Sequence, residues 1–379
     1  MIPDEWQLIE LGKIVTFKSG GTPSKQKPEY WDGAHPWISA KDLKSHFLRE
    51  SKLTLSDQGW VKAKTTPAGS VLVLVRGMTL LKDFPIGITE IEAAFNQDIK
   101  ALVPRDGINS LFLSYLLVAN KKNIRQLVNT AGHGTGRIDT AQLKAYPLLI
   151  PNGKEQNKIA LILSTWDKAI ETVERLINNS KAQKKALMQQ LLTGKRRLPG
   201  FEGEWLRAKL SELTEITYGK SPKEILCAEG KFPVIGTGGV VGRTNTALYD
   251  GPSVVVGRKG TINNPLYIAG SFWAIDTTFY CIPKSTCDIN WLYHTFTSIN
   301  LKNYNEASGV PSLSRGTLYS IRLLTPPIKE QQKIATVLTT VDRKIETLQQ
   351  KLNCLKQEKN ALMQQLLTGK RRVKVDVDG

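Results

Sequence analysis

The chain has 379 residues, of which 41% are hydrophobic and 23% charged, a balance typical of a globular protein long enough for two or three domains. No apolar stretch approaches the roughly 18 residues of a membrane-spanning helix, the first ten residues are acidic where a signal peptide would be basic, and the four cysteines suggest no disulfide framework. We therefore expect a cytoplasmic protein with no membrane partner. The net charge of +18 favours nucleic acid as a partner, although a surface excess of lysine and arginine without a function is the alternative.

The first part of the chain reads as an α+β block. It opens with "EWQLIELGKIVTFKSGGTPS" from Glu5 and contains two strand-like segments, "GSVLVLVRGMT" and "AFNQDIKALVP". A helical stretch follows, and the block closes with the glycine-rich loop "AGHGTGRIDTAQL" and the strand "PLLIP". The second part of the chain repeats this order in weaker form, with "EWLRAKLSELTEITYGKSPK", "GPSVVVGRKGT", "WAIDTTFYCIP", a helical stretch, "ASGVPSLSRGTL" and "RLLTPP".

Each block is followed by a copy of the same long segment. Residues 154–197 and 329–372 align without a gap and are identical at 27 of 44 positions, and the final "ALMQQLLTGKRR" is unchanged. Such an internal duplication determines how the whole sequence is interpreted.

Each copy is predicted to be one long helix. Apolar residues follow alternating steps of three and four, which is the pattern of a coiled-coil seam. The seam is interrupted at Ser180 and Lys184 in the first copy and at Lys359 in the second. Each helix begins after a proline and ends near a glycine, Gly194 or Gly369, with cations beyond it. About 38–40 residues make a rod of roughly 60 Å.

We expect the two helices to pack on each other as an antiparallel coiled coil with pseudo-twofold symmetry. Each copy holds ten Lys or Arg against four Asp or Glu, so the pair carries +12 of the +18. A solvated helix face explains this charge as well as a DNA backbone or a protein partner does. The fold class is therefore α+β, with two globular domains alternating with two long helices. The predicted boundaries are 1–153 and 198–328 for the globular domains, and 154–197 and 329–379 for the helical regions.

With these features the sequence resembles the specificity (S) subunit of a type I restriction–modification system. The resemblance covers essentially the whole chain, and its most specific parts are the duplicated "KEQ-x-KIA…ALMQQLLTGKRR" helices, the "EW…L…G…P" openings and the "GTGRID" and "GVPSLS" loops. It implies two target-recognition domains, each of which reads one half of a split, asymmetric site in double-stranded DNA.

The resemblance also implies partners. Two methyltransferase (M) subunits would dock on the helical regions, the complex would recruit restriction (R) subunits, and the helices would set the spacer between the half-sites. S-adenosylmethionine is then expected in the partner methyltransferase, which flips and methylates an adenine, and ATP and Mg in the partner restriction subunit.

No motif for chemistry of the chain's own is found. "GTGGVVG" at 236–242 misses the G-x-G-x-x-G pattern, because Val241 fills the last position. There is no P-loop, and "NNPLY" lacks one proline of the adenine-methylase motif. The four histidines lie apart from any partner at metal-ligand spacing. We expect no catalytic residue, no metal and no bound cofactor in this chain.

Residues that contact DNA are predicted from residue type and loop position. Base reading favours arginine, lysine and amide side chains, and hydroxyls contact phosphates. An ordinary solvated or salt-bridged side chain is the alternative for each of them. The candidates are Lys41, Arg76, His133, Thr135 and Arg137 in the first block, and Arg243, Arg258, Lys259, Ser312 and Arg315 in the second.

Two alternatives from other classes stay open. The chain could be a stand-alone methyltransferase or nuclease, which would bind S-adenosylmethionine or cleave DNA in isolation. It could also be a coiled-coil scaffold whose heads bind proteins, with the positive charge incidental. Affinity for DNA that falls steeply with salt would favour a DNA-recognition subunit over a protein scaffold, because phosphate contacts release counterions.

Overall fold

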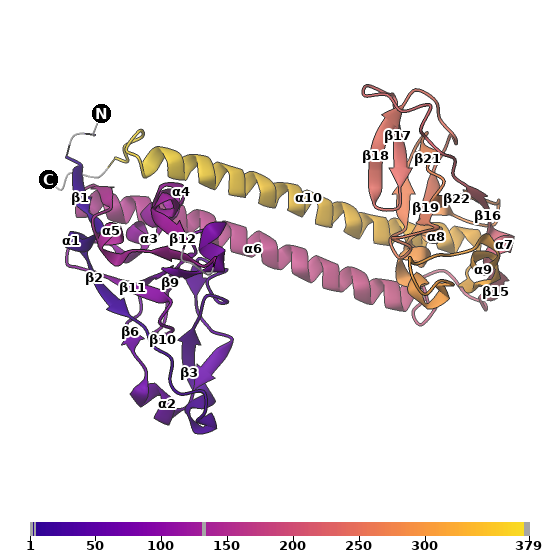
Figure 1. Cartoon of the computed structure of the whole chain (residues 1–379). Coiled ribbons are helices and arrows are strands. Elements are labelled where there is room, and N and C mark those ends of the chain that lie inside the picture. The colour runs from indigo at the N-terminus through magenta and orange to yellow at the C-terminus, as the bar shows by residue number, and fades with distance from the viewer. Residues whose placement is uncertain (1–2, 4, 131–133, 375–379) are drawn as a thin grey trace. The chain divides into compact units, whose positions relative to one another are not determined.

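The computed structural model describes residues 3, 5–130 and 134–374, and the chain separates into two compact units, whose elements are labelled in Figure 1. Unit 1 comprises residues 1–172 and 352–379, and unit 2 comprises residues 173–351. The α+β class is confirmed, because both units combine sheets with helices. We call the globular part of unit 1 the first head and that of unit 2 the second head.

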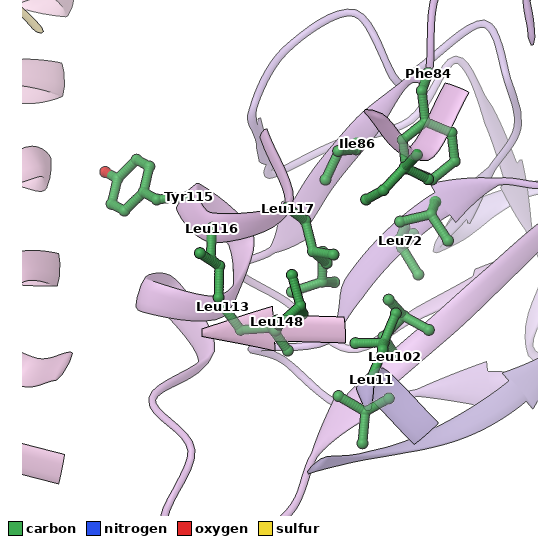
Figure 2. Close-up of a cluster of buried hydrophobic side chains, with 14 of the residues drawn as sticks. Leu11, Leu72, Phe84, Ile86, Leu102, Leu113, Tyr115, Leu116, Leu117 and Leu148 are labelled. Atoms are coloured by element: carbon green, nitrogen blue, oxygen red, sulfur yellow. The ribbon is translucent and has the colours of Figure 1, made fainter. Parts of the chain in front are cut away.

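The core of the first head is a five-stranded sheet covered by one helix. The strand order is β2-β11-β7-β9-β4, and all four residues of the central strand β7 are buried. In Figure 2, Leu72 of β7 and Leu102 of β11 face Leu113 and Leu117 of the covering helix α3. These elements are β2 (Val15–Ser19), β4 (Phe47–Leu48), β7 (Val71–Leu74), β9 (Ile86–Thr89), β11 (Ile99–Pro104) and α3 (Ser110–Ala119).

Three smaller sheets complete the first head. One of them, in the order β5-β3-β10-β6, has a small core of its own around Trp37, Leu55 and Ala94. The other two are β1-β14 and β12-β13-β8. The bounds are β1 (Gln7–Glu10), β3 (Trp31–Ile38), β5 (Leu53–Leu55), β6 (Thr65–Thr66), β8 (Arg76–Gly77), β10 (Ala93–Phe95), β12 (Val128–Thr130), β13 (Gly136–Ile138) and β14 (Pro147–Ile150). Short helices connect them: α1 (Leu11–Ile14), η1 (Pro28–Tyr30), α2 (Asp57–Lys62), η2 (Met78–Leu81), α4 (Lys121–Ile124), η3 (Arg125–Leu127) and α5 (Thr140–Lys144).

The second head has the same framework with fewer strands. Its main sheet has the order β16-β22-β19-β20, and the strand β19 is buried along its whole length. Two further sheets are β15-β23 and β18-β17-β21. The elements are β15 (Leu206–Lys209), α7 (Leu210–Leu213), β16 (Thr214–Tyr218), β17 (Phe232–Gly236), β18 (Gly239–Thr244), β19 (Ser253–Gly257), β20 (Leu266–Ile268), β21 (Trp273–Ala274), β22 (Thr278–Pro283), α8 (Ile289–Ser298), η4 (Leu301–Tyr304), α9 (Arg315–Ser320) and β23 (Arg322–Thr325).

One glycine at the start of each head is required by a close approach of two backbones. A Cβ atom on Gly20 would fall on the carbonyl oxygens of Phe95 and Asn96, and one on Gly219 would fall on those of Ala274 and Ile275. Only a residue without a side chain fits there. The opening segment of each head therefore lies directly against the loop that precedes β11 or β22.

The two predicted long helices are present. They are α6 (Gly153–Leu191) and α10 (Ile328–Leu366), of 39 residues each. Three residues after each helix ends, Gly194 and Gly369 adopt the left-handed conformation, with φ of +69° and +71°, which glycine tolerates best. The first part of α6 and the last part of α10 belong to unit 1, and the remaining parts belong to unit 2. None of the helices in the described residues is long and apolar enough to cross a membrane.

Candidate nucleic-acid interface

In the first head, two of the predicted arginines lie side by side. Arg76 on β8 is directly opposite Arg137 on β13, and both side chains are exposed. Asp98 accepts a hydrogen bond of 2.8 Å from Arg76 Nε, whereas Arg137 has no ion pair within the described part of the chain. Like charges placed opposite each other in a sheet repel. An anion such as a phosphate would relieve this repulsion, so we call Arg76 and Arg137 the first cluster.

In the second head, four of the predicted residues gather around an aromatic ring. The guanidinium groups of Arg258 and Arg315 lie 5.3 and 5.0 Å from the ring centroid of Tyr218, a cation–π arrangement. Lys259 and Ser312 form an antiparallel bridge beside them. Neither arginine has an ion pair with a described residue, so the positive charge is available to an anion. These five residues are the second cluster.

Tyr218 was missed by the sequence analysis, which considered charged and hydroxyl side chains on loops. It is the last residue of β16, and its side chain is 41% exposed. A tyrosine directly before a glycine in the opening segment of the block was the available signal, because aromatic faces stack on bases and on guanidinium groups. The first head has Ser19 at the aligned position, where its hydroxyl accepts a hydrogen bond from Lys100. The two clusters therefore differ in chemistry at equivalent places.

The remaining candidates lie apart from these clusters or are already engaged. Lys41 is exposed in the turn between β3 and β4, and Thr135 is half-buried just before β13. Arg243 on β18 donates to the carbonyl oxygens of Gly230 and Lys231 at 2.6 and 3.0 Å, which is a structural use of its guanidinium group. His133 lies outside the described residues. A role in DNA binding stays a prediction for all ten candidates.

A buried triad joins the first head to both helices of unit 1. Glu155, in the first turn of α6, is fully buried. Its carboxylate accepts hydrogen bonds from Arg372 Nε and Nη2 at 2.8 and 2.9 Å and from Trp6 Nε1 at 3.1 Å. Arg372 is the last residue of the repeated "GKRR", so the end of the second copy binds the start of the first copy. A carboxylate with these partners can be buried at acceptable cost.

The same triad recurs in unit 2. Glu330 in the first turn of α10 is fully buried, and it binds Arg197 through two hydrogen bonds of 2.7 Å. Trp205 Nε1 donates to the same carboxylate at 3.0 Å. We call the two sets the Trp–Glu–Arg triads. They hold Trp6 and Trp205, the residues that open the two blocks, and so tie each head to its helices.

A second polar contact lies further along the helices in each unit. Lys359 donates to Asp167 at 2.5 Å in unit 1, and Lys184 donates to Asp342 at 2.6 Å in unit 2. Lys184 and Lys359 are two of the residues that interrupt the apolar pattern in the sequence. The interruptions are therefore ion pairs between the helices within each unit, as a single polar pair in a coiled coil commonly is.

A residue of each head also reaches this ion pair. In unit 1, Tyr115 donates its hydroxyl hydrogen to Asp167 at 2.5 Å. His294 holds the aligned place in unit 2, with Nδ1 3.9 Å from Asp342 Oδ2. Burial, and secondarily the charge of Lys184, lowers the pKa of His294 to about 4. The imidazole is therefore neutral at pH 7, which suits a position in the head core rather than one in a reaction.

The arrangement of these groups suits binding. The clusters present cations and one aromatic face on strand ends and loops, which can bind phosphates and bases. The described residues contain no group of three or more His, Cys, Asp or Glu side chains placed to hold a metal ion.

Comparison with known protein families gives two matches along the chain. A family model described as the type I restriction modification DNA specificity domain matches residues 3–180 and 202–357. Each matched segment contains one head and part of the helix that follows it.

Individual proteins of known name are also similar. The chain is 31% identical over 166 residues to the Type I restriction enzyme EcoR124I/EcoR124II specificity subunit of Escherichia coli, a match that covers 43% of this chain and only 41% of that protein. It is 25% identical to the EcoprrI specificity subunit of Escherichia coli over 89% of this chain and 87% of that one. The crystal structure of a type I restriction-modification system S subunit from M. genitalium shares the fold, with a TM-score of 0.70, 17% identity and coverage of 97% of this chain and 96% of that chain.

Proposed function

Because the chain belongs to the family of type I restriction–modification DNA specificity proteins, we propose that its two heads read the two halves of a split, asymmetric DNA site. Its relatives are named specificity subunits, and such subunits are not catalysts. Methylation and cleavage then belong to partner subunits, which would supply S-adenosylmethionine, ATP and Mg. Extrusion of the target adenine is needed there because its reactive atom is buried in the base stack.

The single observation that carries this proposal is the pair of unlike clusters on one shared framework. The first cluster is two opposed arginines, and the second is an aromatic ring with cations on it. Heads with the same framework but different side chains at equivalent strand ends suit two different base sequences. An asymmetric site follows from that difference.

The helices support the proposed antiparallel coiled coil with pseudo-twofold symmetry. Asp167 and Asp342 occupy the same position of the two copies, and so do Lys184 and Lys359. The pairing of Lys359 with Asp167 in unit 1 repeats as the pairing of Lys184 with Asp342 in unit 2. A twofold axis requires such reciprocal contacts. Two equivalent helical regions would offer two equivalent docking sites for methyltransferase subunits, and their length would set the spacer.

The test is a map of N6-methyladenine across a host genome. The chain is co-expressed with the methyltransferase of its own system, and methylated adenines are located by sequencing. We expect one new motif with two defined halves and a fixed spacer. The proposal would be contradicted if the methyltransferase is active but no new motif appears, or if the new motif is a single continuous sequence without a spacer.

Salt dependence separates DNA recognition from the protein scaffold that the sequence also allows. The affinity of the assembled complex for its site should fall steeply between 50 and 200 mM salt, by about a thousandfold if six phosphates are contacted. Affinity that is absent or insensitive to salt would favour the scaffold.

A further inference from the structure

The glycine-rich segment 236–242, which does not fit a dinucleotide-binding loop, forms the turn of a hairpin in the second head. Strands β17 and β18 pair antiparallel on either side of this turn (Figure 1). Val240 and Val241 follow the turn, and they are 64% and 59% exposed. Neither valine belongs to a hydrophobic core within the described residues. Exposed apolar side chains are common, so their meaning depends on the backbone that presents them.

A β-bulge directs Val241 outward. Val234 lies opposite Gly242 and Ile235 lies opposite Val240, which leaves Val241 as the extra residue of β18. Bulges bend a strand and re-aim a side chain, and they are frequent next to functional sites. A Cβ atom on the buried Gly236 would lie 2.8 Å from Val241 Cγ1. The glycine therefore leaves the space that the Val241 side chain occupies.

The tip of the hairpin carries a glycine that the fold of the chain does not require. A Cβ atom on Gly238 or Gly239 would meet no atom of a non-neighbouring described residue within 4 Å. Gly239 has a φ of +130°, which explains its glycine. Gly238 has neither a crowded site nor a φ in the left-handed region. A glycine of this kind lets the backbone come close to a partner outside the chain.

The hairpin turn adjoins the second cluster. Ile275 N donates to the carbonyl oxygen of Ile235, which precedes Gly236, at 3.0 Å. The next residue after Ile275 is Asp276, whose carbonyl oxygen accepts a hydrogen bond of 3.1 Å from Arg258 Nη1. Arg258 in turn lies on the ring of Tyr218. The surface that presents cations and an aromatic face therefore continues into the exposed valines.

We propose that the hairpin of β17 and β18 enters the major groove of DNA and that Val241 contacts the C5-methyl group of a thymine. Under the proposed function, on which this inference rests, that thymine is one of the bases read by the second head. The major groove admits a two-stranded β-ribbon, and thymine presents a methyl group there that cytosine lacks. Arg258, Lys259 and Arg315 bind phosphates beside the groove, which positions the hairpin for the contact.

The size of the apolar contact favours a base over a protein. A stable protein interface buries about 800 Å² on each partner, far more than two valine side chains offer. One methyl group of a base needs only one such side chain. Because valine is branched at Cβ, its side chain is already restricted at χ1, so little entropy is lost when it is held against a base. The neighbouring cations attract the phosphates of the same duplex.

The first head has a polar turn at the equivalent place. β3 pairs in parallel with β10, as β17 does with β21, so the turn after β3 corresponds to the turn after β17. There Ser39 donates from its backbone N and from its hydroxyl to Asp42 Oδ2, both at 2.8 Å. This turn closes on a carboxylate, where the second head exposes two valines. We therefore expect the Val241 contact in one half-site only.

The experiment removes methyl groups from either side of the contact. The DNA is a duplex with the divided motif from the methylation map, in which each thymine of both half-sites is replaced in turn by deoxyuridine. Deoxyuridine lacks the C5-methyl group and keeps the base pair. Wild type, Val241→Ala and a control, Val61→Ala, are each assembled with the methyltransferase, and the Kd for every duplex is measured. Val61 is an exposed valine on α2 of the first head.

Wild type and control should bind about fourfold less tightly when one particular thymine is replaced, which is the effect of one buried methyl group. Val241→Ala should bind the unmodified duplex about fourfold less tightly for the same reason, and replacing that thymine should then weaken binding no further. Replacements in the other half-site should have the same effect in all three proteins. Unchanged circular dichroism and melting temperature show that the variants fold.

Two results would overturn the inference and leave the proposed function intact. One is a wild-type complex whose affinity is unchanged by deoxyuridine at every position of both half-sites. The other is a Val241→Ala complex that responds to deoxyuridine as wild type does, which would show that Val241 contacts no thymine methyl group. A methylation map without a divided motif would overturn the proposed function and the inference together.

Discussion

At the scale of the residue, a buried carboxylate decides how each head is attached. Glu330 is fully buried, and its two oxygens accept from both Arg197 and Trp205. A charge removed from water is tolerated only when its partners are present. Because Trp205 begins the second head and Arg197 ends the first helical copy, one carboxylate connects three segments of unit 2.

Replacing this carboxylate by an amide should weaken unit 2. Glu330→Gln offers one acceptor oxygen in place of two, and its NH₂ group faces the donors of Arg197. We expect the free energy of unfolding to fall by about 2 kcal/mol, measured by urea denaturation. Glu202→Gln is the control, because the Glu202 side chain is exposed. An equal loss in the free energy of unfolding in both variants would show that the buried triad stabilises unit 2 no more than an exposed carboxylate does.

The buried His294 should make the protein less stable in mild acid. Its pKa is lowered to about 4, chiefly by burial, whereas in the unfolded chain it is about 6.5. Between these values the unfolded state binds a proton that the folded state does not. The contribution of His294 to the free energy of unfolding is therefore fully present above pH 6.5. It is lost as the pH drops toward 4, which lowers the free energy of unfolding by about 3 kcal/mol.

His294→Tyr tests this without emptying the site, because Tyr115 fills the aligned place in unit 1. The variant should lose less stability than wild type between pH 6.5 and pH 4 in urea denaturation. His46, whose pKa burial also lowers to about 4, is unchanged in both proteins and so cancels in the difference. Equal pH dependence in the two proteins would refute the assignment.

At the scale of the element, the helices show what a sequence pattern can and cannot predict. The three-four spacing is local, so the sequence predicts both helices to within a few residues. Lys184 and Lys359 look like defects in that pattern, because their partners lie on the other helix. The Trp–Glu–Arg triads could not be foreseen either, since Glu155 and Arg372 are 217 residues apart. In the heads, the central strands β7, β11, β19 and β22 were predicted, whereas the outer strands β4, β9 and β20 and the small sheet around Trp37 were not.

A double-mutant cycle measures the ion pair between the helices of unit 1. Lys359→Met leaves Asp167 with the Tyr115 hydroxyl alone, and Asp167→Asn leaves Lys359 without an anion. Each single change should lower the free energy of unfolding, and the double change should cost less than the sum. We expect a coupling energy of about 1–3 kcal/mol. Additive losses would show that the pair contributes little to the pairing of these helices.

At the scale of the whole molecule, the proposed spacer function gives a prediction in base pairs. Seven residues inserted between Glu174 and Arg175, and seven between Lys351 and Leu352, lengthen both helices and keep the heptad phase. Under the proposed coiled coil this adds about 10 Å, or roughly three base pairs at ~3.4 Å each.

The methylation map should then show a spacer longer by about three base pairs between unchanged half-sites. Insertion in one helix alone is the control, because it shifts the two ion pairs out of register. A spacer that stays the same in the doubly lengthened protein would exclude the helices as the ruler.

For the candidate DNA residues, as for the helices, local properties could be predicted from the sequence and long-range contacts could not. Arg76, Arg258 and Arg315 could be chosen from the sequence because charge and loop position are local properties. The residues that lie next to them could not be predicted. Tyr218 contacts Arg258 and Arg315 from a different strand, and Arg137 lies opposite Arg76 only because β13 pairs with β8.

The discontinuity of unit 1 has a consequence for the order of synthesis. Unit 2 is one unbroken stretch, residues 173–351, whereas unit 1 needs residues 352–379 as well as 1–172. Met363, Leu366 and Leu367 fill part of the unit 1 core, and Arg372 neutralises its buried Glu155. On the ribosome the first head to emerge is therefore the last to be completed. A chain that stops short of residue 372 leaves an uncompensated buried charge in unit 1, so unit 1 is stable only in chains that include Arg372.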